Sequence, residues 1–396
     1  MNRALGRTQQ VLCVVQMGLG VGLLAAAGLL ANSLWRLHTQ DPGFRSANIL
    51  GFNLSVPSDH SLDERRRFYQ SALDEVRTIP GVVSAGWITF LPPENRAGVF
   101  MGLAMEGPAL PPASPPRVVN NLITSVDYFS TMSTPVLRGR DFRAGDNQNG
   151  PPVIIVNEAL VRKYFPNQDA LGRRIGTAFD GGKPVREIIG IVKDSKDRGL
   201  ARDAYPTVYI PFPQFALPYG SIVLKTRGPE SDVIAEIRQR LGRLDPSVPL
   251  SDFQTIEDRV YESLEEPRFY TMMATTCAIM AVLFVSLGLY GIVSFSVSRR
   301  TPEFGIRLAV GAQQRTIFRM VLAQGLRMAV AGVALGLLLA VLFTRVLTTL
   351  LFQVRPMDPL TLGAAAAIVV VVTLLASYIP AYRASRVSPI VALRYE

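Results

Sequence analysis

The sequence predicts a membrane protein with four transmembrane α-helices and a large α/β extracytoplasmic domain between the first and the second. Three observations support this fold class. Four long apolar runs are almost free of charge, and each has about the 20 residues that cross a bilayer as a helix. Basic residues gather before the first run, between the second and third runs, and after the fourth. Between the first two runs, roughly 230 residues show strand-like and helix-like periods instead.

The apolar runs divide the chain into spans and the segments that join them. We expect transmembrane spans at residues 11–34, 270–297, 328–350 and 362–380. The segments outside the spans are then residues 1–10, 35–267, 298–327, 351–361 and 381–396. One such run could be a buried core helix, but four runs of this length favour membrane spans.

The first run raises a second alternative, because Arg3 and Arg7 ahead of an apolar stretch also mark secretory signal peptides. Its apolar stretch is longer than such a peptide requires, and no clear cleavage site follows it. Trp35 beyond the run suits an anchor at the membrane interface. We therefore expect a retained span.

The net charge of +10 is distributed unevenly along the chain. Residues 36–267 hold 27 Lys or Arg and 28 Asp or Glu, which leaves 14 basic and 3 acidic residues elsewhere, a net of +11. The basic residues flank the spans at the N-terminus, at residues 298–327 and at the C-terminus. The positive-inside rule then places these three segments in the cytoplasm. The charge reflects topology, and we expect no nucleic-acid partner.

Residue types that carry chemistry are sparse. Cys13 and Cys277 lie in predicted spans, so residues 35–267 have no disulfide framework and must rely on a hydrophobic core. His38 and His60 have no Cys or His neighbour at ligand spacing, so we predict no metal site. Phosphate-loop, dinucleotide-binding, H-E-x-x-H and G-x-S-x-G motifs are absent from the sequence. We expect no cofactor and no enzymatic activity.

Residues 35–267 contain two β-α-β patterns. The first has a strand with Leu50, Phe52, Leu54 and Val56 on one face, a helix over residues 63–79 and a strand over residues 82–90. The second repeats this order over residues 219–227, 230–245 and 248–256. Two such units predict a split ferredoxin-like arrangement around a central insertion.

The insertion begins with a proline-rich segment at residues 106–117, which we expect to be extended. The apolar runs Val153 to Val156 and Ile188 to Val192 predict buried strands of a small β-rich subdomain. The sequence "RGRDF" at residues 138–142 is typical of a charged, solvated surface turn, and we assign it no chemistry.

Residues 298–327 predict a short helix between the second and third spans. Thr301 is a candidate N-cap, Pro302 suits the first helical position, and Glu303 favours the positive end of the helix dipole. Gly311 can end the helix in the left-handed conformation. Two interpretations are open. The helix rests on anionic lipid, or it docks a cytoplasmic partner and passes force between that partner and the spans.

Two further patterns concern the spans themselves. Pro380 is expected to follow the end of the fourth span, and Ser388-Pro389 to open another short helix. Small residues in the first and third spans fit close helix packing, including at a dimer seam: Gly18, Gly22, Gly332 and Gly336. The spans hold almost no charge of the kind that marks a polar pathway.

Four stretches of the sequence resemble a known family. "RRTPEFGIRLAVGA" before a span and "PAYRASRVSPIVALRYE" at the end resemble the FtsX-like permeases of MacB-type ABC transporters. "VNEALVRKYFPNQDALGRRI" and "IIGIVKDSKDRGL" are similar to the periplasmic core domain of that group. The resemblance covers nearly the whole chain, which looks most like one half of the duplicated permeases. The sequence departs from the family pattern at two places. Thr301-Pro302 and Phe304 stand where the pattern has an Arg-rich R-x-E-I, and the segment before the first span is short.

The resemblance implies that residues 301–311 are the coupling helix of the family. The partner-binding residues would then be Glu303, Phe304, Gly305, Arg307, Leu308 and Gly311. It also implies a cytoplasmic ABC ATPase dimer and a second permease copy or paralogue as partners, with membrane lipid around the spans and a periplasmic adaptor protein as a further candidate. The chain would lie in the bacterial inner membrane with both termini in the cytoplasm.

Three hypotheses for function follow. The first is a permease subunit of an ABC-type exporter of antibiotics, peptides or lipoproteins, in which a separate ATPase moves the extracytoplasmic domain by mechanotransmission. The second is a signalling subunit, in which the same movement activates an extracytoplasmic hydrolase without transport. The third is a membrane-anchored sensor or adhesion domain without an ATPase. A neighbouring ATPase would exclude the third.

Overall fold

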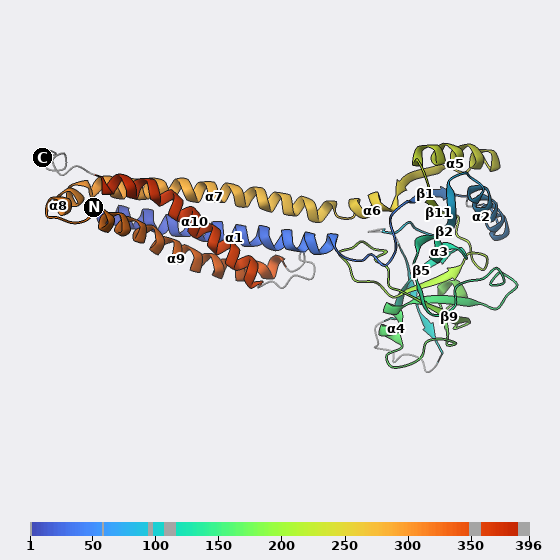
Figure 1. The fold of residues 1–396 in the computed structure, drawn as a ribbon. Coiled ribbons are helices and arrows are strands. Elements are labelled where there is room, and N and C mark those ends of the chain that lie inside the picture. The colour runs from blue at the N-terminus through green and yellow to red at the C-terminus, as the bar shows by residue number, and fades with distance from the viewer. Residues whose placement is uncertain (1, 58, 94–97, 107–115, 348–357, 387–396) are drawn as a thin grey trace. The chain divides into compact units, whose positions relative to one another are not determined.

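The structure is a computed structural model that describes residues 2–57, 59–93, 98–106, 116–347 and 358–386 (Figure 1). The chain forms two compact units. Residues 1–39 and 266–396 form the first, which we call the helical unit, and residues 40–265 form the second, which we call the α/β domain.

The α/β domain contains the two predicted β-α-β units. They comprise β1 (Ile49–Ser55), α2 (Leu62–Arg77), β2 (Val82–Ile88), β11 (Tyr219–Thr226), α5 (Glu230–Leu244) and β12 (Leu250–Thr255). Their strands pair antiparallel in the order β12-β1-β11-β2. Because each unit contributes one outer and one inner strand, the two units interlock, and the predicted split ferredoxin-like arrangement is confirmed.

The amphipathic pattern of α2 explains how it packs on this sheet. Ser61 and Glu64 form a capping box, in which the Ser61 hydroxyl accepts from the Glu64 amide and the Ser61 amide donates to the Glu64 carboxylate. The buried face has the predicted helical spacing and carries Tyr69, Ala72, Leu73 and Val76. Phe68, the residue before Tyr69, lies only partly buried against the same core.

The insertion between β2 and β11 extends the sheet. Its elements are β3 (Val99–Gly102), β4 (Ala104–Met105), β5 (Val118–Thr124), α3 (Tyr128–Met132), β6 (Val136–Gly139), β7 (Val153–Asn157), α4 (Glu158–Tyr164), β8 (Arg174–Gly176), the 3-10 helix Ala178–Asp180, β9 (Arg186–Val192) and β10 (Thr207–Pro211). The sheet continues from β2 as β5-β10-β7-β9-β8-β4, with β3 beside β5 and β6 beside β9. The predicted buried strands β7 and β9 are confirmed, and they pair in parallel.

The "RGRDF" segment differs from the expected solvated turn. Phe142 is buried in a hydrophobic cluster with Phe129 and Tyr209. The Arg140 guanidinium pairs with both oxygens of the Asp146 carboxylate, at 2.7 and 2.9 Å, and this carboxylate side chain is only 6% exposed. Burial of Asp146 is tolerated because a two-point ion pair replaces the lost water. The prediction of a purely solvated surface turn was therefore wrong.

The helical unit contains the four expected long apolar helices. They are α1 (Asn2–His38), α7 (Glu265–Arg299), α9 (Gln314–Leu347) and α10 (Pro359–Ser385), and each has the length and composition of a membrane span. A fifth helix, α8 (Thr301–Ala309), lies between α7 and α9. Helix α9 packs against both α1 and α10 (Figure 1). The helix α9 already begins at Gln314, so much of the segment expected between the second and third spans is helical.

Small residues bring α1 and α9 together within one chain. A methyl group at Gly332 would lie 2.5 Å from Met17, and one at Gly336 would lie 2.5 Å from Val21 and 2.7 Å from the Gly18 carbonyl oxygen. A methyl group at Gly22 would be 4.0 Å from its nearest neighbour. Three of the four glycines that we associated with close packing, Gly18, Gly332 and Gly336, therefore serve a contact within the chain.

Pro380 lies inside α10 and does not end it. The helix continues to Ser385, and the proline ring is buried. A proline removes one backbone hydrogen bond, which membrane helices tolerate where neighbouring elements and local adjustments compensate. The helix therefore continues beyond residue 380, where we expect the fourth span to end. Ser388-Pro389, most of the proline-rich segment and residues 348–350 of the third expected span lie outside the described residues.

Candidate functional site

Helix α8 is joined to α7 by a single residue. Arg300 is the N-cap of α8, and its carbonyl accepts from the Phe304 amide at 2.9 Å. Thr301, which we expected to cap the helix, already belongs to it, and its hydroxyl donates to the Val297 carbonyl of α7 at 3.0 Å. Because a single residue joins the two helices, Thr301 lies within one turn of the last carbonyls of α7. The helix is thereby fixed directly to the end of α7.

The C-terminal end of α8 is closed by a Schellman motif. Gly311 has a φ of +95°, the left-handed conformation that was predicted. Its amide donates to the Leu308 carbonyl at 3.1 Å, and the Ala312 amide donates to the Arg307 carbonyl at 2.9 Å. These two bonds satisfy carbonyls that the end of a helix leaves without partners. The following helix, α9, starts only three residues after Gly311.

One side of α8 is part of the core of the helical unit. Phe304 is only 1% exposed and lies in a cluster with residues of α1, α7, α9 and α10. Gly305 is buried, and Leu308 is partly buried against the same cluster. These residues lie on one stripe because positions three and four apart share a helix face. The stripe holds α8 firmly to the spans.

The opposite side of α8 is apolar and exposed. Ile306 is 52% exposed and Val310 is 84% exposed. Pro302 and Ala309 are exposed on the same side, since their spacing from Ile306 and Val310 is that of one helix face. Apolar side chains that gather on one exposed face mark a surface for a partner or a membrane. We call these four residues the outer stripe of α8.

A charge cluster flanks the two stripes. The Glu303 carboxylate pairs with Arg300 at 2.9 Å and with Arg307 at 2.6 Å. Arg307 also donates to the sulfur of Met320 on α9 at 3.3 Å. Glu303 lies in the first turn of α8, where a negative charge favours the positive end of the helix dipole. The three charged side chains therefore stiffen α8 and link it to α9.

The six predicted site residues have three different placements. Phe304, Gly305 and Leu308 face the helical core, although we expected Phe304 to face a partner. Glu303 and Arg307 form the half-exposed ion pair, and Gly311 ends the helix. Sequence reasoning missed Ile306 and Val310. The signal was present as a second stripe of apolar residues at helical spacing, but nothing in the sequence distinguished the two stripes, because both are apolar.

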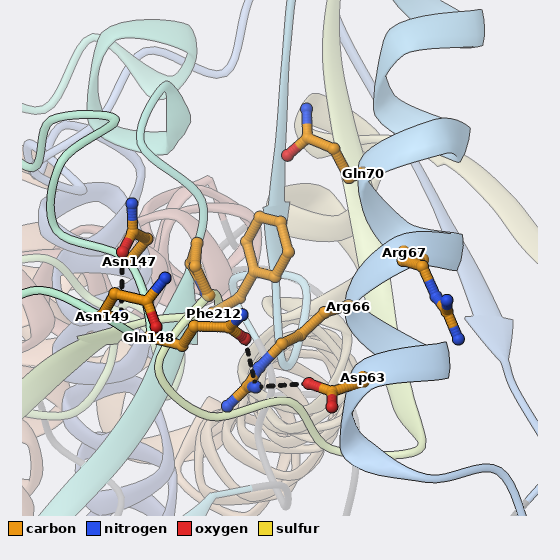
Figure 2. Close-up of a pocket in the computed structure, with 9 residues that line it drawn as sticks. Asp63, Arg66, Arg67, Gln70, Asn147, Gln148, Asn149 and Phe212 are labelled. Carbon is orange, nitrogen blue, oxygen red and sulfur yellow. Dashed lines mark hydrogen bonds and ion pairs between the residues drawn. The ribbon is translucent and has the colours of Figure 1, made fainter.

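The α/β domain has a separate polar groove between α2 and the loop before β7 (Figure 2). Its volume is about 500 Å³, and its lining includes Asp63, Arg66, Arg67, Gln70, Phe212 and Pro213 with the amide side chains of Asn147, Gln148 and Asn149. Arg66 crosses the groove and bonds to Asp63 at 2.9 Å, to Gln148 at 2.6 Å and to the Gln214 carbonyl at 3.1 Å.

The groove does not have the features of a catalytic centre. Arg66 is bound by partners on both sides of the groove, so its charge contributes to holding the domain together. Over the described ranges of the chain, no three His, Cys, Asp or Glu side chains gather where they could hold a metal ion. We therefore take the outer stripe of α8 as the candidate functional site.

Comparison with known proteins gives matches over both units. The family described as a MacB-like periplasmic core domain matches residues 11–241, and the family described as an FtsX-like permease C-terminal region matches residues 275–389. Among solved structures, the periplasmic region of MacB from Actinobacillus actinomycetemcomitans is 14% identical, with a TM-score of 0.38, and is matched over 58% of this chain and 98% of its own. The extracellular domain of the transporter YknZ is 16% identical, with a TM-score of 0.35, over 51% and 100% of the two chains.

Curated relatives are named macrolide export ATP-binding/permease protein MacB. The protein from Escherichia coli is 26% identical over 284 residues, which are 68% of this chain and 42% of that protein. The protein from Aeromonas hydrophila is 24% identical over 282 residues, again 68% and 42%. The chain thus spans about two fifths of the length of these relatives. Since one family match covers more than half of the chain and a second covers the remaining spans, the chain belongs to the FtsX-like permeases with a MacB-like periplasmic core domain.

Proposed function

We propose that this chain is a permease subunit of an ABC-type exporter. In this proposal a cytoplasmic ATPase dimer binds and hydrolyses ATP, and the resulting movement reaches the α/β domain through the spans. The curated relatives are named as combined ATP-binding and permease proteins, and this sequence contains no phosphate-binding loop. In this proposal the nucleotide chemistry comes from an ATPase that lies outside the residues of this sequence.

The observation that carries the proposal is the outer stripe of α8. An exposed stripe with Ile306 and Val310 on a helix outside the predicted spans favours a partner that covers it. The opposite stripe anchors α8 among the spans through Phe304. Because both ends of α8 are fixed by backbone hydrogen bonds, a push on the outer stripe moves the ends of α7 and α9 with it. A short, closed helix of this kind transmits displacement better than a loop.

The orientation and the remaining partners belong to the same proposal. The N-terminus, α8 and the C-terminus lie in the cytoplasm, because the basic residues gather at those segments. The permease pairs with a second copy or a paralogue, and a periplasmic adaptor joins the α/β domain. Macrolide export is the activity stated in the names of the relatives, and we propose an antibiotic, peptide or lipoprotein as the exported substrate.

The test places a charge on the outer stripe in the full-length chain. Ile306→Asp and Val310→Asp would bury an unpaired carboxylate in the contact with the ATPase, which is costly. We expect recovery of the cognate ATPase with the affinity-purified chain to fall by about tenfold or more. Gln313→Asp is the matched control, because it adds the same charge at an exposed polar position just beyond the stripe. This variant should recover the ATPase at the wild-type level.

The lipid interpretation of α8 predicts a different outcome. If the outer stripe rests on the membrane, Ile306→Asp and Val310→Asp recover as much ATPase as the wild type, and that result would contradict the docking proposal. Phe304→Asp is a second control, which shows the effect of a charge on folding instead of on docking. It puts a charge into the core of the helical unit, so we expect loss of the folded, detergent-extractable protein before any question of binding arises.

A further inference from the structure

The segment that follows α1 is bound to the insertion before the chain enters β1. Polar contacts join residues 40–45 to distant parts of the α/β domain. The Asp41 carboxylate pairs with the Lys193 ammonium at 2.6 Å. The Pro42 carbonyl accepts from the Lys196 amide at 2.8 Å, and the Arg45 amide donates to the Met132 carbonyl at 3.0 Å.

Gly43 lies at the centre of this segment and meets the backbone of the loop after β9. Its φ is +84°, in the left-handed region that favours glycine. A methyl group at this position would lie 2.0 Å from the Asp194 carbonyl oxygen and 2.9 Å from the Ser195 Cα. The Gly43 amide donates to the Asp41 carboxylate at 2.8 Å. The Lys193 ammonium, and to a smaller extent this amide, lower the pKa of Asp41 by hydrogen bonding to its carboxylate. Only a residue without a side chain allows this contact.

The loop that Gly43 meets is itself attached to α4. The Asp194 carboxylate accepts from the Ala159 amide at 2.7 Å and pairs with Arg162 at 2.6 Å. In return, the Glu158 carboxylate accepts from the Asp194 amide at 3.2 Å. Asp194 therefore connects two segments: its backbone carbonyl contacts Gly43 after α1, and its carboxylate binds α4. The neighbouring Phe44 is buried in the hydrophobic cluster of Phe129 and Tyr209, which secures the segment from the other side.

The segment before α7 has a different attachment. It contains the helix α6 (Ile256–Glu262), which is capped by the Thr255 hydroxyl and packs on β1 and β12. Both strands belong to the ferredoxin-like part of the sheet. Ile256 of α6 also belongs to the hydrophobic cluster that buries Phe44. The two segments differ in their polar contacts, since residues 40–45 bind the insertion whereas α6 is capped and packed within the ferredoxin-like part.

We propose that residues 40–45 are a staple that passes the displacement of α1 directly to the insertion through Asp194 and α4, with Gly43 as the residue that positions it. Without the staple, a movement of α1 would reach the insertion only by way of β1 and the rest of the sheet. The displacement itself rests on the proposed function, whereas the staple as a contact does not.

The test compares two glycine substitutions in the full-length chain in lipid nanodiscs, by hydrogen exchange of backbone amides. Gly43→Ala adds a methyl group against the Asp194 carbonyl. Gly228→Ala is the matched control, because Gly228 also has a positive φ, of +110°, but a methyl group there would meet nothing within 4 Å. We expect amides of residues 158–164 and 193–200 to exchange about tenfold faster in Gly43→Ala. In Gly228→Ala they should keep their wild-type rates.

Residues 219–226 of β11 report whether the domain as a whole has survived, and they should be unchanged in both variants. If Gly43→Ala does not fold, Lys193→Gln removes the ion pair without backbone strain and should accelerate exchange at residues 40–45 and 193–200 by about threefold. Wild-type exchange at α4 in Gly43→Ala, or equal acceleration in Gly228→Ala, would overturn the staple.

A second measurement uses the complex with the cognate ATPase, with and without ATP. In the wild type and in Gly228→Ala, nucleotide should change the exchange at α4, and in Gly43→Ala this change should be lost although the ATPase is still recovered. Retention of the nucleotide effect in Gly43→Ala would contradict the staple. A wild-type chain that recovers no ATPase would contradict the proposed function instead, and the comparison of the two glycine variants would stand.

Discussion

The α/β domain and the helical unit contain the same kinds of apolar side chain in opposite situations. In the α/β domain the largest ones are fully buried, as Trp87, Tyr69 and Phe52 are. In the helical unit many of the largest remain exposed, as Met272 is at 74% and Leu375 at 68%. The hydrophobic effect in water can therefore fold the α/β domain by itself, whereas the helical unit requires a lipid environment to cover its outer faces.

The two units also differ in where they place charge. The α/β domain buries an ion pair, Arg186 with Asp180 at 2.8 Å, whose side chains are 7% and 4% exposed. The spans of the helical unit, as far as the structure describes them, hold no ion pair in their apolar middle, and Arg300, Glu303 and Arg307 are confined to α8 and its start. A charge inside a folded domain can be matched by a partner, but one in lipid lacks both water and partners.

The largest expected effect concerns topology and is all-or-none. A reporter fused after Asn147 in the α/β domain should be active only in the form that detects an external position, and one fused after Gln313 beyond α8 should report the cytoplasm. Fusions near Met357, outside the described residues, and at the C-terminus should read as external and cytoplasmic, respectively. A cytoplasmic signal at Asn147 would break the comparison, because the two units would then not lie in different environments.

The next effect tests whether the α/β domain is self-sufficient. Residues 40–265, produced alone in a reducing cytoplasm, should be soluble and folded. Trp87→Ala should then lower the free energy of unfolding by about 3–5 kcal/mol, because the indole is fully buried against Tyr69 and Phe212. Urea denaturation followed by circular dichroism measures the change. Recovery of the wild-type domain only as aggregate would show that its core depends on the spans or on a partner.

An effect of intermediate size is the pH dependence of the stability of the α/β domain, which tests how this domain tolerates the buried carboxyl of Asp141. Desolvation by burial raises the pKa of Asp141 to about 6. Since this pKa is higher in the folded than in the unfolded state, the stabilising contribution is complete below about 4 and is lost as the pH rises through about 6. Asp141→Asn should therefore match the wild-type domain near pH 4 and exceed its stability at pH 7 by roughly 1–2 kcal/mol, discounted for solvent screening.

Urea denaturation of both proteins from pH 4 to pH 8 measures this difference directly. Titrating groups that do not interact with Asp141, such as Asp41, cancel because they are present in both proteins. A constant difference over the whole range would mean that the Asp141 carboxylate titrates near its ordinary pKa.

The smallest effect concerns the start of α2. Ser61→Ala removes one half of the capping box, so we expect a loss of about 1 kcal/mol in the free energy of unfolding of residues 40–265. Ser71→Ala is the matched control, since it makes the same exchange at an exposed position inside the same helix, where alanine is favourable. An equal response of the two variants would exclude a contribution from the cap.

Local patterns predicted much of the α/β domain, and long-range pairing explains what they missed. The strands and helices predicted for the two β-α-β units are present in the structure, because each was predicted from residues that are neighbours in sequence. The order of the insertion strands could not be predicted, since β5 pairs with β10 across more than 80 residues. The burial of Asp146 was missed for a different reason, since its partner Arg140 is only six residues away. A charged turn and a buried ion pair have similar sequences, and only the surrounding packing separates them.

For α8, local patterns alone predicted a short helix after the second span that closes at Gly311, because its proline, glutamate and glycine act on neighbouring backbone groups. Which side of the helix is buried and which is exposed depended on the packing of the spans around it. Phe304 and Ile306 are both apolar and lie on different stripes, and the shape of the space between the spans accepts the phenyl ring. The role of Gly43 was decided in the same way, since a glycine in sequence predicts a turn but cannot show which distant peptide, here that of Asp194, will press against it.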